Sequence, residues 1–347
     1  MPQSIIVGIG MYVPESIYTN DHLTQYMDTS DEWIQERTGI KERRYAQRLG
    51  ETTTTMGIEA AKIALERAGI TAQDVDFIIF ATISPDYYFP GCGVLVQREM
   101  KMKEIGALDI RNQCSGFIYA LSIADQFIKT GMYKNILVIG SEKHSFGLDF
   151  STRGRNISVI FGDGAGAVLL QATEDGERGI LSTHLHSNGE NAEVLAMYNP
   201  GTHGNHWGNF AKFEDAEMGN TFMSHAMIDE AMNYPNMDGQ AVFKKAVEKF
   251  PEVIKEALDK NNLTTSDIDM LIPHQANLRI SQMIQKLLRL PTEKVFNNIE
   301  KYGNTTAASI PIALCEAWQD GKIKKGDLVC LAAFGSGFTW GSALIRW

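Results

Sequence analysis

The feature that most constrains the fold of this chain of 347 residues is an internal repeat. The segment ALERAGITAQDVDFII, residues 64–79, aligns without a gap on ALDKNNLTTSDIDMLI, residues 257–272. Both segments have the pattern of a helix end, a turn and a buried, β-rich run. Self-similarity at a fixed spacing indicates that one structural unit is used twice. We therefore expect two similar halves, residues 1–172 and residues 173–347.

The repeat extends to a helix near the middle of each half. At the same spacing, Ala120 and Leu121 match Ala313 and Leu314. The strand-like runs NILVIGSEKHS and DLVCLAAFGSG follow these helices. Strands that alternate with helices predict an α/β fold in which a parallel sheet is covered on both faces. Ligands of such sheets bind at the carboxyl ends of the strands, so we expect the site where the two copies meet.

The two copies differ at residues whose side chains could act in catalysis. Cys114 stands at the start of the first helix, where the second copy has Ala307. His274 follows a strand of the second half, where the first half has Ala81, and Asn304 precedes the second copy of the helix. A helix N-terminus stabilises a thiolate, so we expect a lowered pKa for the Cys114 thiol. A cysteine from one half and a His and Asn from the other predict one shared pocket.

Composition excludes several classes of protein. The formal net charge of -10 argues against a nucleic-acid partner. The four cysteines show no CxxC spacing, which argues against a zinc cage or a disulfide framework. No apolar run approaches the roughly 20 residues that span a membrane, and the first residues do not resemble a secretory signal. We therefore expect a cytoplasmic protein with reduced thiols, no bound metal and no membrane partner.

Basic side chains gather shortly after His274. Arg279, Lys286 and Arg289 recur at spacings that place them on one face of a helix. Lys244 lies on the preceding helical segment. In a chain this acidic, such a face indicates a docking surface for an acidic partner.

Four motifs, CSGF, PHQANLRI, GNTTAAS and FGSGFTWGSAL, together resemble the β-ketoacyl-acyl carrier protein synthase III family of the thiolase superfamily. TNDHL, DTSDEWIQERTGIKERR and FGDGAGA extend the resemblance over almost the whole chain. The resemblance implies a thiolase-like, duplicated five-layered α/β/α/β/α fold, which agrees with the repeat. It also implies a homodimeric acyltransferase that uses no metal or redox cofactor.

The resemblance assigns the chemistry residue by residue. Cys114 would receive an acyl group from acyl-CoA, while the backbone N–H groups of Cys114 and Ser336 bind the oxyanion. His274 and Asn304 would bind the carbonyl oxygen of malonyl-acyl carrier protein as it loses carbon dioxide. The implied product is a β-ketoacyl-acyl carrier protein, which initiates fatty acid synthesis.

The resemblance also assigns the binding surfaces. Three residues would contact CoA: Trp33, Arg37 and Arg155. The basic face would dock the acidic carrier protein through Lys244, Arg279 and Lys286. Phe89 would reach from one subunit into the acyl pocket of its partner.

Three features depart from the family pattern. Gln113 replaces a small residue, and Ser336 replaces a glycine. Residues 199–239 form a segment longer than the typical member has, and a long insertion in a compact domain is usually functional. We hypothesise that this insertion affects the choice of starter acyl group.

These departures leave two other functions open. One is a specialised condensing or acyl-transfer enzyme of the same family, distinguished by whether malonyl carrier protein is consumed and carbon dioxide released. The other is a thiol hydrolase, because papain-like proteases also use Cys, His and Asn. The hydrolase predicts that His274 pairs with Cys114 as a base.

Overall fold

Two sheets form the centre of the protein. The computed structural model describes residues 2–174, 176–202 and 223–347. In these residues a five-stranded sheet has the order β1-β7-β6-β4-β5, and a four-stranded sheet has the order β11-β12-β13-β8. The strands of the two sheets are β1 (Gln3–Tyr12), β4 (Phe77–Ala81), β5 (Gly106–Ile110), β6 (Asn135–Glu142), β7 (Gly164–Thr173), β8 (Gly179–Ser187), β11 (Met270–Pro273), β12 (Leu328–Gly335) and β13 (Thr339–Arg346). Two short ribbons pair β2 (Ile17–Thr19) with β3 (Glu42–Arg44) and β9 (Leu195–Ala196) with β10 (Asn236–Met237).

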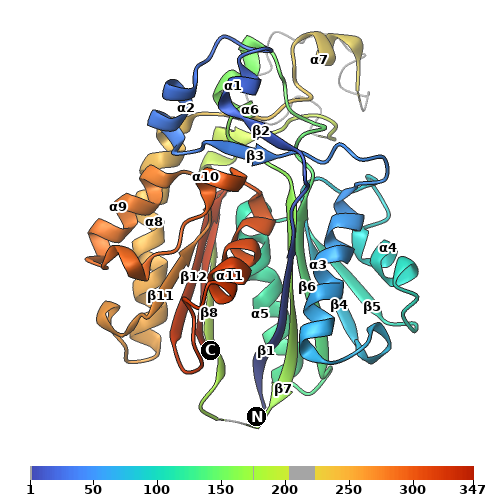
Figure 1. Ribbon diagram of the computed structural model, residues 1–347, viewed down its shortest axis with the longest axis vertical. Helices are drawn as coiled ribbons and strands as arrows, with labels where there is room; N and C mark the ends of the chain where they lie inside the picture. The colour runs from blue at the N-terminus through green and yellow to red at the C-terminus, as the bar shows by residue number, and fades with distance from the viewer. Residues whose placement is uncertain (1, 175, 203–222) are drawn as a thin grey trace.

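Helices and sheets alternate in five layers (Figure 1). Helices α3 and α4 cover the outer face of the first sheet, α8 and α9 lie on the outer side of the second, and α5 and α11 lie between the sheets. The helices are α1 (Asn20–Leu23), α2 (Asp31–Thr38), α3 (Thr53–Ala68), α4 (Cys92–Glu99), α5 (Gly116–Lys129), α6 (Arg155–Ser158), α7 (His225–Asp229), α8 (Gly239–Lys260), α9 (Leu278–Leu288), α10 (Ile299–Tyr302) and α11 (Ser309–Gln319). None of the helices in the described ranges is long and apolar enough to cross a membrane.

The topology of the second sheet repeats that of the first. Strand β4 is parallel to β6, and β6, β7 and β1 follow as antiparallel neighbours. In the same way β11 is parallel to β12, and β12, β13 and β8 are antiparallel. A short 3₁₀ turn precedes each middle helix, and its first residue has a positive φ in both copies, 44° at Gln113 and 48° at Thr306. The chain passes from one sheet to the other between β7 and β8, and the division at residue 172 stays a prediction.

The two middle helices are buried on nearly every side. Phe117, Ile118 and Leu121 of α5 share one core cluster with Ile310 and Leu314 of α11. A helix that is apolar all round is stable only where protein surrounds it, and the facing sheets provide that environment. The packing therefore holds the N-termini of α5 and α11 close to each other, between the sheets.

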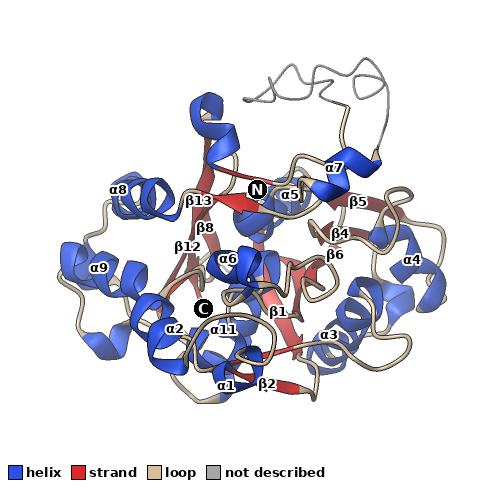
Figure 2. Cartoon of the chain, turned by 90° about the horizontal axis from the view of Figure 1, so that it is seen from above, coloured by secondary structure: helices blue, strands red, loops and turns tan. Residues whose placement is uncertain are grey.

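The parallel strands of both sheets end on one side of the molecule. Within each sheet the pairing directions give β1 the direction of β4 and β6, and β8 the direction of β11 and β12. Figure 1 shows that these strands of both sheets run toward the same end of the molecule. Helices α1, α2, α6 and α7 lie over this end, and Figure 2 looks down on it. The loops that follow β4, β5, β6, β11 and β12 all open beneath this cover.

Close packing of β1 on α3 makes a first prediction. A Cβ at Gly8 would lie 2.0 Å from the carbonyl oxygen of Ala64. Gly8 and Ala64 are both buried, and the backbone of α3 cannot move aside easily. Gly8→Ala should therefore lower the free energy of unfolding by about 1–3 kcal/mol, measured in urea. Gly176→Ala is the matched control, since a Cβ there meets no atom within 4 Å. Equal stability of the two variants would contradict the packing of β1 on α3.

Candidate active site

Cys114 lies where the two halves of the protein touch. It belongs to the 3₁₀ turn Gln113–Ser115 between β5 and α5, and it is 7% exposed. Gly335, the last residue of β12 in the other sheet, packs directly against it. A Cβ at Gly335 would lie 2.4 Å from the Cβ and 2.7 Å from the Sγ of Cys114. Only glycine fits at this position, so the backbone that follows β12 approaches the thiol closely.

The surroundings of Cys114 keep its thiol protonated. Burial raises the pKa of the thiol to about 12, the Glu142 carboxylate raises it further, and the N–H groups of Ser336 and Cys114 lower it. The expectation of a lowered pKa is therefore wrong for the free site. The physical reason is that desolvation outweighs two N–H donors, and that α5 itself begins only at Gly116. Those two N–H groups nevertheless lie beside Sγ, where they can donate to the oxyanion that forms on the carbonyl carbon bound to Sγ.

Glu142 ends β6 and shapes the cavity beside the thiol. Its carboxylate is fully buried and accepts hydrogen bonds from Thr82 Oγ1 at 3.0 Å, Ile83 N at 3.1 Å and Ser84 Oγ at 2.6 Å. Burial raises the pKa of Glu142 to about 7, and these donors oppose the shift. The carboxylate thus holds the loop after β4, and Ile83 and Ser84 of this loop line the cavity beside Cys114.

His274 follows β11, and its ring is oriented by α11. The Nδ1 atom lies 2.6 Å from Oγ of Ser309, and this oxygen also accepts the N–H of Gln275 at 3.4 Å. A proton donated by this hydroxyl to Nδ1 places the ring proton on Nε2. The buried Nε2 has no hydrogen-bond partner in the part of the chain that the structure describes. Because burial lowers the pKa of His274 to about 3, the ring is neutral at physiological pH.

Asn304 is held in front of the second 3₁₀ turn. Its Oδ1 accepts the N–H of Thr306 at 2.8 Å, so the Nδ2 end of the amide is the end left to donate. Its backbone N–H donates to Ile160 O at 2.8 Å, and its carbonyl accepts the N–H of Gly162 at 3.1 Å. Asn304, before the turn that leads into α11, and His274, after β11, can thus present two neutral donors beside the start of α11.

A cavity of about 190 Å³ opens beside Cys114. Its walls are mainly apolar, from Ile83, Phe146, Leu148, Phe161, Leu195, Ala196, Met197 and Pro235. Its polar lining comes from Ser84, Arg111, Gln113, His144, Thr306 and Ser336. His274 and Asn304 do not line this cavity. Asn304 accepts a hydrogen bond from Thr306, which lines the cavity. His274 forms a hydrogen bond with Ser309, the residue directly after the turn that Thr306 begins.

Sequence reasoning missed His144. Its Nε2 lies 2.7 Å from Thr306 Oγ1, and burial lowers the pKa of the ring to about 3. A neutral His144 therefore helps to fix Thr306, whose backbone N–H in turn holds the Asn304 side chain. Its position near the end of the predicted strand-like run NILVIGSEKHS was the available signal, but nothing in one sequence shows that the ring turns toward Thr306.

The three residues expected to contact CoA lie together near the cover. The guanidinium carbon of Arg37 is 4.4 Å, and that of Arg155 is 5.4 Å, from the ring centroid of Trp33. Arg155 Nη1 donates to the Asp28 carbonyl at 2.6 Å, and Asn277 Nδ2 donates to the Arg37 carbonyl at 2.9 Å. The second contact places this cluster beside the start of α9.

The expected docking and dimer residues are exposed. These are Lys244 of α8, Arg279 and Lys286 of α9, and Phe89, which is 81% exposed. Lys245 and Lys249 pair with Glu248 and Glu252 on α8, so they add little net charge to the basic face. The roles of the exposed residues stay predictions.

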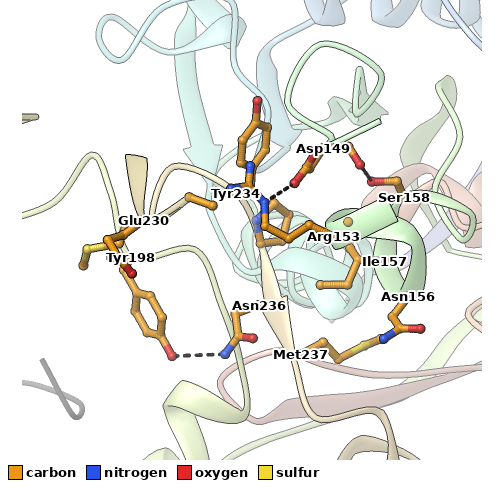
Figure 3. Close-up of a pocket in the computed structure, with 14 residues that line it drawn as sticks. Asp149, Arg153, Asn156, Ile157, Ser158, Tyr198, Glu230, Tyr234, Asn236 and Met237 are labelled. Carbon is orange, nitrogen blue, oxygen red and sulfur yellow. Dashed lines mark hydrogen bonds and ion pairs between the residues drawn. The ribbon is translucent and has the colours of Figure 1, made fainter. Parts of the chain in front are cut away.

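A second cavity, of about 440 Å³, lies between α6 and the described part of the insertion (Figure 3). Arg153 Nε donates to Asp149 Oδ2 at 2.7 Å, and its guanidinium lies 5.8 Å from the Tyr234 ring. Pro235 lines both cavities, so the insertion borders the Cys114 cavity. Residues 203–222 of the insertion lie outside the described residues. In the described ranges no three His, Cys, Asp or Glu side chains group as metal ligands, and the absence of a metal stays a prediction.

Two repeated α/β halves with a buried cysteine at their contact define a condensing enzyme of the thiolase-fold class. Residues 108–189 match the family model of 3-oxoacyl-[acyl-carrier-protein] synthase III, and residues 258–347 match the model of its C-terminal part. The chain is 44% identical to the β-ketoacyl-[acyl-carrier-protein] synthase III of Rhodospirillum centenum over 99% of both chains. It is also 44% identical to that of Clostridioides difficile, over 99% of this chain and 98% of the relative.

A solved structure agrees with the sequence relatives. The 3-oxoacyl-[acyl-carrier-protein] synthase III of Aquifex aeolicus superposes with a TM-score of 0.87 at 44% identity, covering 99% of this chain and 100% of that one. The chain belongs to the β-ketoacyl-acyl carrier protein synthase III family, whose members are acyltransferases. The predicted family and the predicted thiolase-like fold are confirmed.

The raised pKa of Cys114 predicts slow alkylation of the free enzyme. Because the pKa lies at about 12, the rate of modification by iodoacetamide should still be rising at about pH 10, well above the range of an activated thiol. Intact-mass spectrometry measures the singly modified protein, and Cys114→Ala corrects for the other cysteines. A rate that levels off below about pH 8 would show that the site stabilises the thiolate.

Proposed function

We propose that this protein condenses an acyl-CoA starter with malonyl-acyl carrier protein, giving a β-ketoacyl-acyl carrier protein and initiating fatty acid synthesis. The observation that carries the proposal is the contact between the halves. There a buried thiol faces two backbone N–H groups. Two neutral donors lie beside the start of α11: Asn304 Nδ2, from the segment before it, and His274 Nε2, from the segment after β11. The family relationship supports the same reaction.

The first step transfers the acyl group to the enzyme. Sγ of Cys114 attacks the thioester carbonyl, and the N–H groups of Cys114 and Ser336 bind the oxyanion that forms. The C–S bond to CoA then breaks, and the leaving sulfur takes the thiol proton. Because the free thiol has a high pKa, proton loss accompanies attack instead of preceding it. Trp33, Arg37 and Arg155 would hold the CoA nucleotide, through stacking and charge.

The second step forms the new carbon–carbon bond. The malonyl thioester oxygen accepts hydrogen bonds from His274 Nε2 and Asn304 Nδ2, and the bond to the carboxylate breaks with release of carbon dioxide. The enolate carbon attacks the acyl carbon on Cys114, and the C–S bond breaks to return the sulfur as a thiolate, which takes a proton from solvent because the original thiol proton left with CoA. Both donors are neutral and buried, so they stabilise the enolate without first being desolvated. These bond changes balance without an electron acceptor or a metal.

The proposed partners follow from the exposed residues. The carrier protein would dock on the basic face of α8 and α9, next to the CoA cluster that Asn277 joins to α9. A homodimer would bring Phe89 of one protomer to the acyl cavity of the other.

The described residues lack the cysteine–histidine hydrogen bond that a thiol hydrolase of the papain type requires. No hydrogen bond joins Cys114 to His274 within the residues that the structure describes, and His274 Nδ1 is engaged by Ser309. A papain-like base would need its ring against the thiol. The specialised condensing alternative remains separable by experiment.

The deciding experiment uses two readouts on one protein. Intact-mass spectrometry after incubation with short, branched and long acyl-CoAs should show a gain of one acyl group that Cys114→Ala abolishes. Adding malonyl-acyl carrier protein to the acylated enzyme should release carbon dioxide and return the unmodified mass. Acylation without carbon dioxide release would favour the specialised alternative, and no acylation by any acyl-CoA would overturn the proposal.

Asn304→Asp tests the donor role of the amide. The aspartate keeps an oxygen for the Thr306 N–H but replaces the Nδ2 donor by a charge that repels an enolate. We expect carbon dioxide release to fall about 10²–10³-fold, the usual cost of one lost oxyanion donor. Acylation of Cys114 in the same variant is the internal control and should be unchanged. A parallel fall of both steps would indicate a structural role instead.

Charge reversal tests the docking face. Arg279→Glu should raise the KM for malonyl-acyl carrier protein about tenfold and make it less sensitive to salt, because an exposed charge acts mainly on association. Acylation by acyl-CoA should change little. Lys322→Glu is the control, in the exposed turn before β12 at the opposite end of the sheet. Equal effects of the two variants would count against the dock.

A further inference from the structure

Two polar side chains face the Cys114 cavity without a partner. Arg111 and Gln113 both line the cavity, and neither side chain has a hydrogen bond or ion pair with any described residue. Asn112, between them, turns away and donates to Ser115 Oγ at 3.2 Å. Arg111, directly after β5, is exposed, Gln113 begins the 3₁₀ turn of Cys114, and both residues line the cavity next to the nucleophile.

These side chains contrast with the walls around them. The cavity is mainly apolar, and an Arg guanidinium adds a positive charge with five N–H donors, while a Gln amide adds two donors. By contrast, two other arginines on this side of the molecule form ion pairs: Arg153 with Asp149, and Arg155 with Asp28. Arg111 is thus an exposed cation that has no counter-ion among the described residues, at the edge of an apolar cavity. Such a site favours a ligand with an apolar body and an anionic end.

The size of the cavity limits that ligand. An engineered cavity of about 150 Å³ holds one benzene molecule, and the cavity beside Cys114 measures about 190 Å³. By that comparison the cavity holds about seven or eight heavy atoms, which is the size of a four- or five-carbon acyl group that ends in a carboxylate. A planar carboxylate at the far end of such a chain can take two parallel N–H bonds from one guanidinium.

We propose that the starter is the CoA monothioester of a short dicarboxylic acid, and that Arg111, with Gln113, binds its free carboxylate. This inference rests on the proposed function. The transfer is the one already described: the acyl carbon bonds to Sγ of Cys114, the bond to the CoA sulfur breaks, and CoA leaves with the proton. The far carboxylate takes no part in bond making and is retained in the β-keto product.

The test compares acyl-CoAs of equal length with and without the carboxylate. Glutaryl-CoA against valeryl-CoA, and succinyl-CoA against butyryl-CoA, are the matched pairs. The readout is the rate of Cys114 acylation, measured by intact mass. The wild-type enzyme should prefer the carboxylated member of each pair about tenfold or more, as expected for a partly exposed charge-assisted contact.

Substitution of Arg111 should abolish that preference. Arg111→Met should slow acylation by glutaryl-CoA about tenfold while leaving the valeryl-CoA rate unchanged or higher. Arg111→Lys should keep part of the preference, because the charge remains but the paired N–H geometry is lost. Arg98→Met is the control, since Arg98 is an exposed arginine of α4 that pairs with Glu99. The valeryl-CoA rate of Arg111→Met also shows that the variant is folded.

Two outcomes overturn the inference in distinguishable ways. If valeryl-CoA acylates the wild type as fast as glutaryl-CoA, and Arg111→Met changes neither rate, the carboxylate site is wrong and the proposed condensation stands. If no acyl-CoA of either kind modifies Cys114, the proposed function fails together with the inference.

Discussion

The burial of α5 and α11 between the two sheets is the constraint on which the site depends. Each helix is apolar on nearly every face, so it is stable only inside the five-layered arrangement. Once the helices are buried there, their N-termini bring Cys114 and the turn after Asn304 to the same contact. Gly335 then allows the backbone after β12 to close against the thiol. The catalytic geometry is a consequence of how the two copies of one unit pack.

Desolvation sets the resting electrostatics of this contact. It raises the pKa of Cys114, lowers the pKa of His274 and His144, and brings the pKa of Glu142 to about 7. The thiol and both imidazoles are therefore neutral before a substrate binds. Charge develops only when a thioester is attacked or a carboxylate is lost, and the donors that meet this charge are already in place.

The duplication separates architecture from chemistry. The strained turn occurs in both copies, with a positive φ at Gln113 and at Thr306, so its backbone belongs to the repeated unit. The side chains on it differ. One copy carries the nucleophile and the polar pair Arg111 and Gln113, and the other carries Asn304 and the Ser309 that orients His274. One fold unit thus supplies the acyl acceptor and, in its second copy, the donors for decarboxylation.

The sequence by itself determined the repeat, the five-layered fold, the family, and the candidate residues Cys114, His274 and Asn304. The repeat and the candidate residues depend on patterns local to the chain, such as the alternation of strands and helices and the asymmetry between equivalent positions. The five-layered fold and the family came from the resemblance of several motifs to a known family. Only the tertiary structure decided the direction of the Cys114 pKa, the contacts of Glu142 and His144, and the exposure of Arg111 to the cavity. Desolvation and side-chain direction depend on which distant segments enclose a group, and a helix N-terminus read from sequence does not show how much water the fold removes.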